Sequence, residues 1–170
     1  MSQSKKYFGK YRGTVFNNID PEQLGRIMAI VPDVNGATPT AWALPCMPIA
    51  GKQQGVYVLP HVGDAVWIEF EQGDLKHPIW VGGFWSSATE VPSAGSAANP
   101  GIVIQTQLQQ GVAVSDMPPS PTTGGVILHS SNGASIVVND AGIFISNGKG
   151  ATISMVGPTV TINNGALEII

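Results

Sequence analysis

The sequence predicts an all-β protein with two parts, a small N-terminal barrel and a repetitive, β-rich C-terminal extension. Glycine and proline are enriched, with 21 and 13 residues in a chain of 170, which favours short strands and turns over helices. Apolar and polar residues alternate along Asp64–Glu71 with the period of a half-buried strand, so that Val66, Ile68 and Phe70 share one face. Charged residues make up only 11% of the chain, and most of them lie in its first half.

Five short strands are expected in the first half, separated by segments rich in Asp, Asn, Gly and Pro. The expected strands are Tyr7–Phe16, Gly25–Val31, Gly55–Leu59, Asp64–Glu71 and Ile79–Phe84. Five strands without a helical period suggest a small closed or nearly closed barrel, and the oligonucleotide/oligosaccharide-binding architecture (OB-fold) has that strand count. The segment Ala37–Lys52, which carries Trp42 and three prolines, is expected to be a long loop that caps the barrel or projects from it.

The middle of the chain has little content that could form a core. Ser86–Pro100 reads as a linker of small residues, and Asp116–Gly125 as a stiff, proline-rich spacer. Between them, Ile102–Val114 fits either a pair of strands or an extended arm. We therefore expect a barrel at residues 1–85, a linker with an extended arm at 86–125 and a β-rich extension at 126–170.

From Val126 onward, short alternating segments are separated by Asn-Gly, Ala-Gly and Gly-Pro turns. The residues expected to face inward are Ile136, Val138, Ile143, Ile145, Ile153, Met155, Val160, Ile162, Leu167 and Ile169. A lone sheet of such strands would leave this set in water and both sheet edges open. Three copies wound around one axis would bury the set, so we predict a trimeric, intertwined β-helix or β-prism. The alternative is a sheet that simply caps the barrel.

Bulk properties narrow the range of functions. A net charge of −3 and a pI near 5.4 provide no basic stripe for nucleic acid. Cys46 is the only cysteine, which excludes an internal disulfide. The basic N-terminus is followed by no apolar run, so we expect synthesis in the cytoplasm without a signal peptide.

Two stretches of the first half resemble a known family. They are YFGKYRGTVFNNIDPEQLGRIMAIVPDVNG and PHVGDAVWIEFEQGDLKHPIWVGGFW, with Trp42 and Leu59–Pro60 between them. They resemble the OB-fold domain of phage baseplate assembly protein V, which also occurs in spikes of contractile injection systems, including the valine-glycine repeat proteins of type VI secretion. The resemblance covers about Tyr7–Trp85, and its signature positions are Gly25, Arg26, Pro60, Gly63, Asp64, Trp67, Glu69, Phe70, Gly73, Asp74, Pro78, Gly82 and Trp85.

This resemblance implies a homotrimeric central spike, assembled into a phage tail or injection particle, that caps a tube or hub and punctures the target envelope. Its partners would be a baseplate hub or tube-initiator protein and, transiently, the target membrane. The interval after the barrel holds no lysozyme domain, and no His-x-His motif lies near the C-terminus. We therefore expect a separate tip protein, similar to PAAR-repeat proteins, to dock on Leu167, Ile169 and Ile170. The alternative is an OB-fold adaptor with a trimerising tail that binds glycan or single-stranded nucleic acid.

Candidate catalytic groups are few. Glu69 and Glu71 would share one face of a strand at about the 7 Å separation of an inverting glycosidase, but a solvated strand face is the simpler interpretation. Cys46 has no nearby histidine in sequence, and His61, His77 and His129 are isolated from one another. The Gly-Lys pairs at 51–52 and 148–149 lack a phosphate-loop context. We expect no enzyme activity, no cofactor and no metal.

A single cluster could support the adaptor alternative. It combines basic and aromatic residues, as single-strand binding requires, and consists of Lys5, Lys6, Tyr7, Phe8, Lys10, Tyr11 and Arg12. We prefer to interpret it as an N-terminal strand that docks onto a partner subunit.

Overall fold

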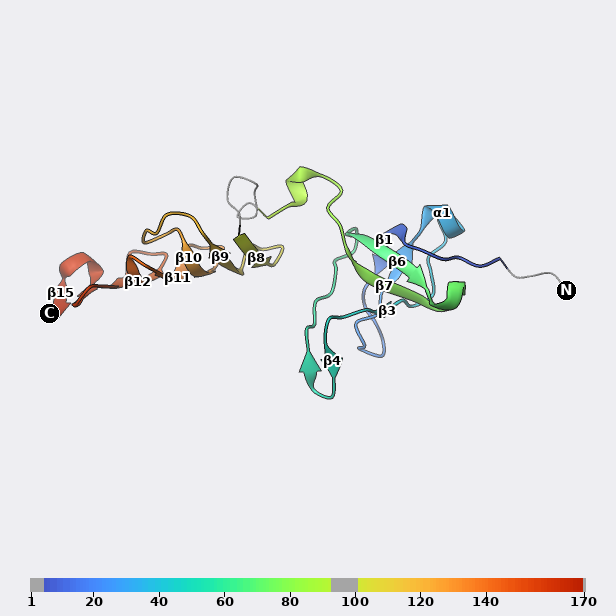
Figure 1. The fold of residues 1–170 in the computed structure, drawn as a ribbon, viewed down its shortest axis with the longest axis horizontal. Helices are drawn as coiled ribbons and strands as arrows, with labels where there is room; N and C mark the ends of the chain where they lie inside the picture. Colours follow the sequence, from blue (N-terminus) through green and yellow to red (C-terminus); the bar gives the residue numbers. More distant parts are fainter. Residues whose placement is uncertain (1–4, 93–100, 170) are drawn as a thin grey trace. The chain divides into compact units, whose positions relative to one another are not determined.

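The computed structural model describes residues 5–92 and 101–169, and the chain divides into two compact units, Met1–Ser86 and Ser87–Ile170. Nearly all of its regular structure is β-strand, as predicted (Figure 1). Among the described residues, no helix combines the length and apolar character that a membrane span needs. Residues 93–100 of the predicted linker, and Ile170, lie outside the described residues.

The elements of the N-terminal unit are short. Its strands are β1 (Tyr11–Asn17), β2 (Met28–Ile30), β3 (Leu44–Pro45), β4 (Ala50–Gly51), β5 (Gln54–Gly55), β6 (Ala65–Phe70) and β7 (Pro78–Gly83). Its helical turns are α1 (Pro32–Asn35) and η1 (Glu71–Gly73).

Five chain segments close the barrel of this unit. Strands β2, β1, β6 and β7 pair in that order, each antiparallel to the next. Strand β3 adds to β7 in parallel, through the pair Leu44↔Ile79. The bridges Ile27↔Ala43 and Ile30↔Pro39 then connect the segment before β3 back to β2. The pairings therefore run around a complete ring, which is the five-stranded barrel predicted from the sequence.

The barrel interior is apolar and fully enclosed. Its buried residues are Val15, Ile27, Ala29, Val31, Ala43, Val66, Ile68, Phe70 and Trp80. The alternation predicted for β6 is confirmed, because Val66, Ile68 and Phe70 are buried while Trp67 and Glu69 are not. The one buried polar side chain described here, Thr40, accepts a hydrogen bond at Oγ1 from the backbone N–H of Ala29.

Two predictions for this unit were wrong. The segment predicted as strand Gly55–Leu59 leaves β5 at Gly55 and has no strand partner, because Val56, Tyr57 and Val58 lie on the exposed side of an arm. The missing strand comes instead from Ala37–Lys52, which was predicted to be a loop and supplies β3 and both closing bridges. The other four strands are confirmed, with ends shifted by up to four residues.

The arm is the hairpin β4–β5 with its flanks, residues 46–58, and it extends away from the barrel strands (Figure 1). The Val56 N–H donates to the Ile49 carbonyl at 3.1 Å, just below the hairpin. A Cβ on Gly55 would lie 2.6 Å from that same carbonyl oxygen, so only glycine permits the two backbones to approach this closely. The hairpin is therefore tight and fixed by its own hydrogen bonds.

The C-terminal unit contains one antiparallel meander of eight strands, ordered β15-β14-β13-β12-β11-β10-β9-β8. The strands are β8 (Gly101–Gln105), β9 (Gly111–Ser115), β10 (Gly125–His129), β11 (Ala134–Asn139), β12 (Gly142–Asn147), β13 (Thr152–Val156), β14 (Thr159–Ile162) and β15 (Leu167–Ile169). Two helical turns, η2 (Ala88–Glu90) and η3 (Asn163–Gly165), complete it. Ile102–Val114, for which two interpretations were open, forms the strand pair β8–β9. The sheet thus begins at Gly101 and continues without a break past Val126.

A long loop between β9 and β10, residues 116–124, lies against one face of this sheet. Asn139 of β11 holds it there, because its Nδ2 donates to the carbonyls of Ser120, Thr123 and Gly124 at 2.7, 2.9 and 3.3 Å. The Asn139 Oδ1 accepts from the N–H of Ala141, which fixes the amide in this orientation. The proline-rich spacer predicted for this region is therefore attached to the sheet through its second half, from Ser120 to Gly124.

A charge cluster stabilises the turn that precedes β2. Asp20 Oδ1 accepts from Nη2 and Nε of Arg26 at 2.6 and 3.1 Å, and Asp20 Oδ2 accepts from the N–H of Leu24. The Arg26 guanidinium also lies 5.7 Å from the Trp42 ring centroid. The Arg26 hydrogen bonds, with those from the backbone, hold the pKa of the Asp20 carboxyl well below its ordinary value.

Asp20→Asn should lower the melting temperature at pH 7, because Arg26 loses its most direct counter-charge. An Asp whose folded pKa is depressed contributes stability that is present above its unfolded pKa of about 3.9 and is lost as the pH falls further. The difference between wild type and variant should therefore be constant from pH 7 to about 5 and shrink below about pH 4. Thermal melts across this range, with Asp33→Asn as the exposed control, measure it; a difference that persists unchanged at pH 2 would contradict the assignment.

Asn139→Ala should destabilise the C-terminal unit by about 1–3 kcal/mol, since three carbonyls of the 116–124 loop lose their donor. Urea denaturation measures this loss, and faster cleavage of the loop by a protease should accompany it. Asn132→Ala, in an exposed turn of the same sheet, is the matched control. Equal stability of the two variants would show that Asn139 does not hold the loop.

Candidate functional site

One face of the C-terminal sheet is apolar across all of its strands. The register aligns the side chains in two rows that cross the strands from β8 toward β15. The first row consists of Ile104, Val112, Leu128, Ile136, Ile145, Ile153, Ile162 and Leu167. The second consists of Ile102, Val114, Val126, Val138, Ile143, Met155 and Val160. We call these two rows the apolar face.

The set predicted to face inward, from Ile136 to Leu167, lies together on this face, and Ile169 occupies the next register position opposite Val160. The prediction missed the members on β8, β9 and β10, namely Ile102, Ile104, Val112, Val114, Val126 and Leu128. On each strand these residues lie two positions apart, as in the later set, although the residues between them, Val103, Ala113 and Ile127, are apolar too. The glutamines between β8 and β9 and the prolines after β9 concealed that signal.

The apolar face is open to solvent in the single chain. Ile102 and Ile104 are 66% and 69% exposed, Leu167 is 53% exposed, and most of the members between them are about 40% exposed. No described element of this unit packs over the face to bury it. Folded monomers rarely expose a contiguous apolar surface of more than a few hundred Å². A surface of this kind marks a site of association.

The opposite face has a different composition. Its central row begins with Val103, Ala113, Ile127, Val137 and Phe144 and continues with Ser154 and Thr161. Val137 is only 1% exposed, on the same side of the sheet as the Asn139 side chain that holds the 116–124 loop. Farther along, Ser154 and Thr161 form a hydroxyl–hydroxyl hydrogen bond of 2.6 Å. Each part of this outer face is therefore either covered or polar, whereas the apolar face is largely exposed and carries apolar side chains.

Glycines at strand starts let neighbouring strands approach closely. A Cβ on Gly125 would lie 2.1 Å from the carbonyl oxygen of Val138, and one on Gly142 would lie 2.3 Å from that of Met155. Both residues also have positive φ, at +75° and +151°. Side chains at these positions would push β10 and β12 away from their neighbours and misalign the two apolar rows.

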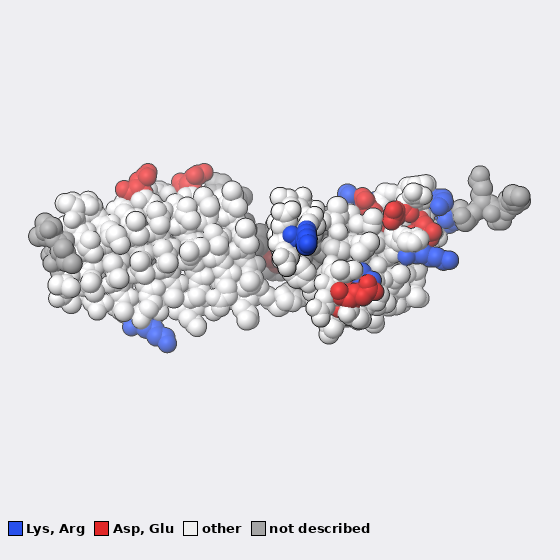
Figure 2. All heavy atoms as spheres, turned by 90° about the horizontal axis from the view of Figure 1, so that it is seen from below, with Lys and Arg blue, Asp and Glu red and all other residues white. Residues whose placement is uncertain are grey.

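Charge is almost absent from the C-terminal unit. After Glu90 the sequence contains only Asp116, Asp140, Lys149 and Glu168. Figure 2 shows the consequence, a surface that is uncharged over nearly all of the visible sheet, whereas more charged groups, of both signs, are scattered over the N-terminal unit. Association of the C-terminal unit must therefore rest on apolar burial and backbone pairing.

The signature positions of the barrel mostly fix turns. Gly25 has φ +75° and its carbonyl accepts from Trp80 Nε1 at 3.1 Å, next to the Arg26–Asp20 pair. Asp64 Oδ2 accepts from the His61 N–H at 2.7 Å, closing the turn that leads into β6. Asp74 accepts at Oδ1 from the Lys76 N–H, which lowers the pKa of the Asp74 carboxyl.

The remaining signature positions lie in or beside β6 and β7. Trp67 and Phe84 rings lie 4.7 Å apart, and Arg12 stacks on both at 5.5 and 5.2 Å. Trp85, by contrast, is largely exposed. The other signature residues are Pro60 and Gly63 before β6, Glu69 and Phe70 in it, Gly73 in η1, and Pro78 and Gly82 in β7.

The candidate catalytic pair does not form as predicted. Strand β6 ends at Phe70, and Gln72 with φ +50° turns the chain, so Glu71 lies in η1 rather than beside Glu69 on the strand. Glu69 forms an ion pair with Lys10 at the surface. Gly51 ends β4 and Lys52 begins the hairpin turn, whereas Gly148 and Lys149 both lie in the bend between β12 and β13.

Other candidate groups are also dispersed. His77 lies 3.6 Å from Asp74, His129 ends β10, and His61 lies in the turn before β6. Cys46 is an exposed free thiol. Within residues 5–92 and 101–169, no three His, Cys, Asp or Glu side chains are placed to hold a metal ion.

Two members of the basic and aromatic cluster at the N-terminus, Tyr7 and Tyr11, pack on the chain's own barrel, and docking of the cluster onto a partner subunit stays a prediction. The rings of Tyr7 and Tyr11 lie 6.2 and 5.7 Å from that of Phe70, and the Tyr7 N–H donates to the Gly73 carbonyl. Lys5 lies over the Tyr7 ring. The two tyrosine rings are thus engaged with the core, and Phe8 remains exposed.

The residues predicted to bind a tip protein are described only in part. Leu167 begins β15, the edge strand of the sheet, and is exposed. Ile169 ends that strand, and Ile170 lies outside the described residues. Their role stays a prediction.

Comparison with known families matches both units. A family model described as the type VI secretion system/phage-baseplate injector OB domain matches residues 11–85. A second, described as the phage baseplate V C-terminal trimerisation domain, matches residues 101–168. No curated protein matches the chain. The two matches coincide with the barrel and with the eight-stranded sheet that carries the apolar face, and together they cover most of the sequence. The chain therefore belongs to the phage baseplate protein V and type VI secretion spike family.

Proposed function

We propose that this protein is the central spike of a contractile injection apparatus, and that it punctures the target envelope. The family consists of structural baseplate and spike proteins, and the match to its trimerisation domain supports a homotrimer that is part of a baseplate or injection particle. The puncturing role goes beyond this, and the apolar face is the observation that supports it. An apolar surface on every strand favours a continuous, rigid shaft over a flexible tether.

The shaft would be strong because its parts cooperate. Three sheets packed through their apolar faces would bury six rows of side chains along one axis, and each face would be excluded from water only while all three chains stay together. A compressive load would then be shared by many backbone hydrogen bonds at once. The largely uncharged outer face would allow such a shaft to enter lipid with few charges, since only Asp140, Lys149 and Glu168 follow Val126 in the sequence.

The barrels and the far end of the sheet would have separate roles. We propose that the barrels seat on a hub or tube-initiator protein, since the OB domain of this family belongs to the injector. At the other end, β15 offers an unpaired strand edge and the exposed Leu167, to which a PAAR-like tip protein would add.

Ile136→Asp should prevent trimer formation, because three carboxylates would meet inside a dry interface. Ser135→Asp, one residue earlier on the opposite face of β11, should leave the trimer intact. Light scattering of the purified full-length variants measures both masses. If Ile136→Asp forms trimers as stable as those of Ser135→Asp, the apolar face is not the trimer core.

The puncturing role predicts an effect of charge on the outer face. Thr152→Lys with Thr159→Lys places six lysines on a trimer, each costing about 2.5–3.5 kcal/mol near the centre of a bilayer. Particles assembled with this variant should form normally but deliver their contents at least about tenfold less often, while Thr152→Gln with Thr159→Gln should act as wild type. Equal delivery by the lysine and glutamine particles would argue against passage of this shaft through lipid.

A further inference from the structure

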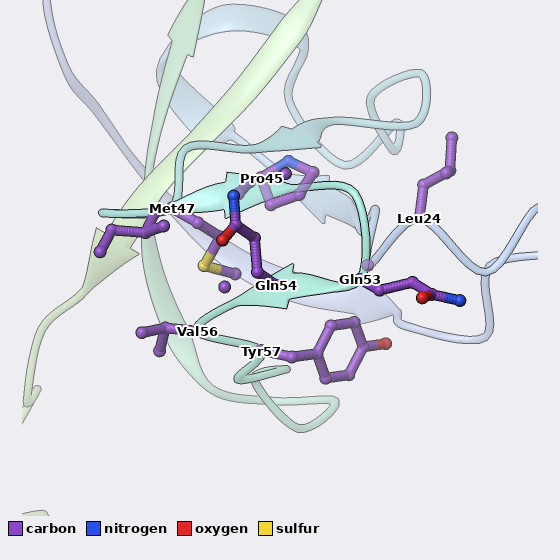
Figure 3. A pocket seen from close by; sticks show the side chains of 12 residues that line it. Leu24, Pro45, Met47, Gln53, Gln54, Val56 and Tyr57 are labelled. Carbon is purple, nitrogen blue, oxygen red and sulfur yellow. The ribbon is translucent and has the colours of Figure 1, made fainter.

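The barrel carries a surface groove that takes no part in closing the barrel. It lies between the arm and the turn before β2, has a volume of about 390 Å³, and is framed by Leu24, Pro45, Met47, Val56 and Tyr57 (Figure 3). Figure 3 shows these side chains along the arm hairpin and on the neighbouring loop. No Asp, Glu, Lys, Arg or His lines the groove.

The groove is uncharged and mostly apolar, and its lining also includes the polar side chains of Gln53 and Gln54. Leu24, Ile49, Val56 and Tyr57 are 53%, 61%, 49% and 69% exposed, so the main apolar side chains of the arm face solvent in the single chain. The arm hairpin is held by its own hydrogen bonds and by the close approach at Gly55, which means that the groove is preformed. A rigid, uncharged, mostly apolar surface of this kind fits a partner whose matching surface is also mostly apolar and uncharged.

The length of chain between the barrel and the trimerisation domain limits how far apart the three barrels of a trimer can lie. The barrel ends with β7 at Gly83 and the trimerisation domain starts with β8 at Gly101, so the connecting chain can span at most about 65 Å even when fully extended. Three barrels connected to one trimeric shaft are therefore confined to a small volume. Within it, the effective concentration of one barrel relative to another is on the order of millimolar. At that concentration a modest apolar contact between barrels is populated without any further partner.

We infer that the groove of each barrel is covered by a neighbouring barrel of the same trimer, and that the three barrels form a closed ring. The contact joins the arm side of one barrel to a different surface of the next, and three such contacts related by a three-fold axis close on themselves. This inference rests on the trimer of the proposed function and adds a second interface to it. It assigns the exposed apolar residues of the arm to contact between subunits.

Cysteine reactivity in the full-length protein tests the inference. In a Cys46→Ser background, Val56→Cys places a thiol in the groove and Val62→Cys places one outside it, at positions that are 49% and 61% exposed in the single chain. In purified trimers the groove thiol should react with a maleimide at least about tenfold more slowly than the control thiol, equivalent to about 1.4 kcal/mol of protection. A benzophenone maleimide attached at Val56→Cys and irradiated should give covalent species of two or three chains after full denaturation, and at Val62→Cys it should give none.

Each result is decisive when the mass of the same sample is measured by light scattering. If the protein is monomeric, the proposed function fails. If it is trimeric but the two thiols react at equal rates, only the covered groove is overturned. Protection at Val56→Cys with crosslinks confined to a single chain would overturn it as well, because the chain's own C-terminal unit would then be the cover.

Discussion

The need to remove one face of the C-terminal sheet from water governs the whole molecule. Fifteen apolar side chains stand in two rows on that face, most of them about 40% exposed or more in a single chain. Full burial of an aliphatic side chain is worth about 1.5–3 kcal/mol, so covering what remains exposed yields on the order of 10 kcal/mol per chain. Association costs an estimated 4–15 kcal/mol, and a trimer supplies three such faces. With almost no charge in this unit, no other interaction of similar size is present to hold the copies together.

The two units differ in how their apolar sheet faces and strand edges are covered. The barrel pairs its strands in a ring, so the same chain supplies both the apolar residues and their cover. The meander leaves β8 and β15 as edges and its apolar face open, so its cover has to come from other copies. Ion pairs such as Asp20–Arg26 occur in the unit that folds on itself, where they fix turns. In the other unit that task falls to uncharged contacts, of which the amide of Asn139 is the clearest.

Much of this organisation could be predicted from the pattern of residues, and the errors have physical causes. Alternation identified β6 and the later strands of the meander correctly, because those strands have one buried or apolar face. The segment Val56–Val58 is rich in β-branched and aromatic residues, as strands are, yet it belongs to an exposed arm, since composition alone does not say whether a strand partner exists. Strand β3 was missed because it is two residues long, contains Pro45 and pairs in parallel with a strand far along the chain. Only tertiary structure reveals such a pairing, and the groove beside it, which no sequence motif marks.

Sedimentation equilibrium on the full-length chain, from about 1 to 50 μM, decides whether the apolar face is covered in solution. A single species at three times the 17.7 kDa chain mass, with no dissociation across this range, is the expected result. A folded species at 17.7 kDa would contradict it, because the two apolar rows would then be stable in water without a partner.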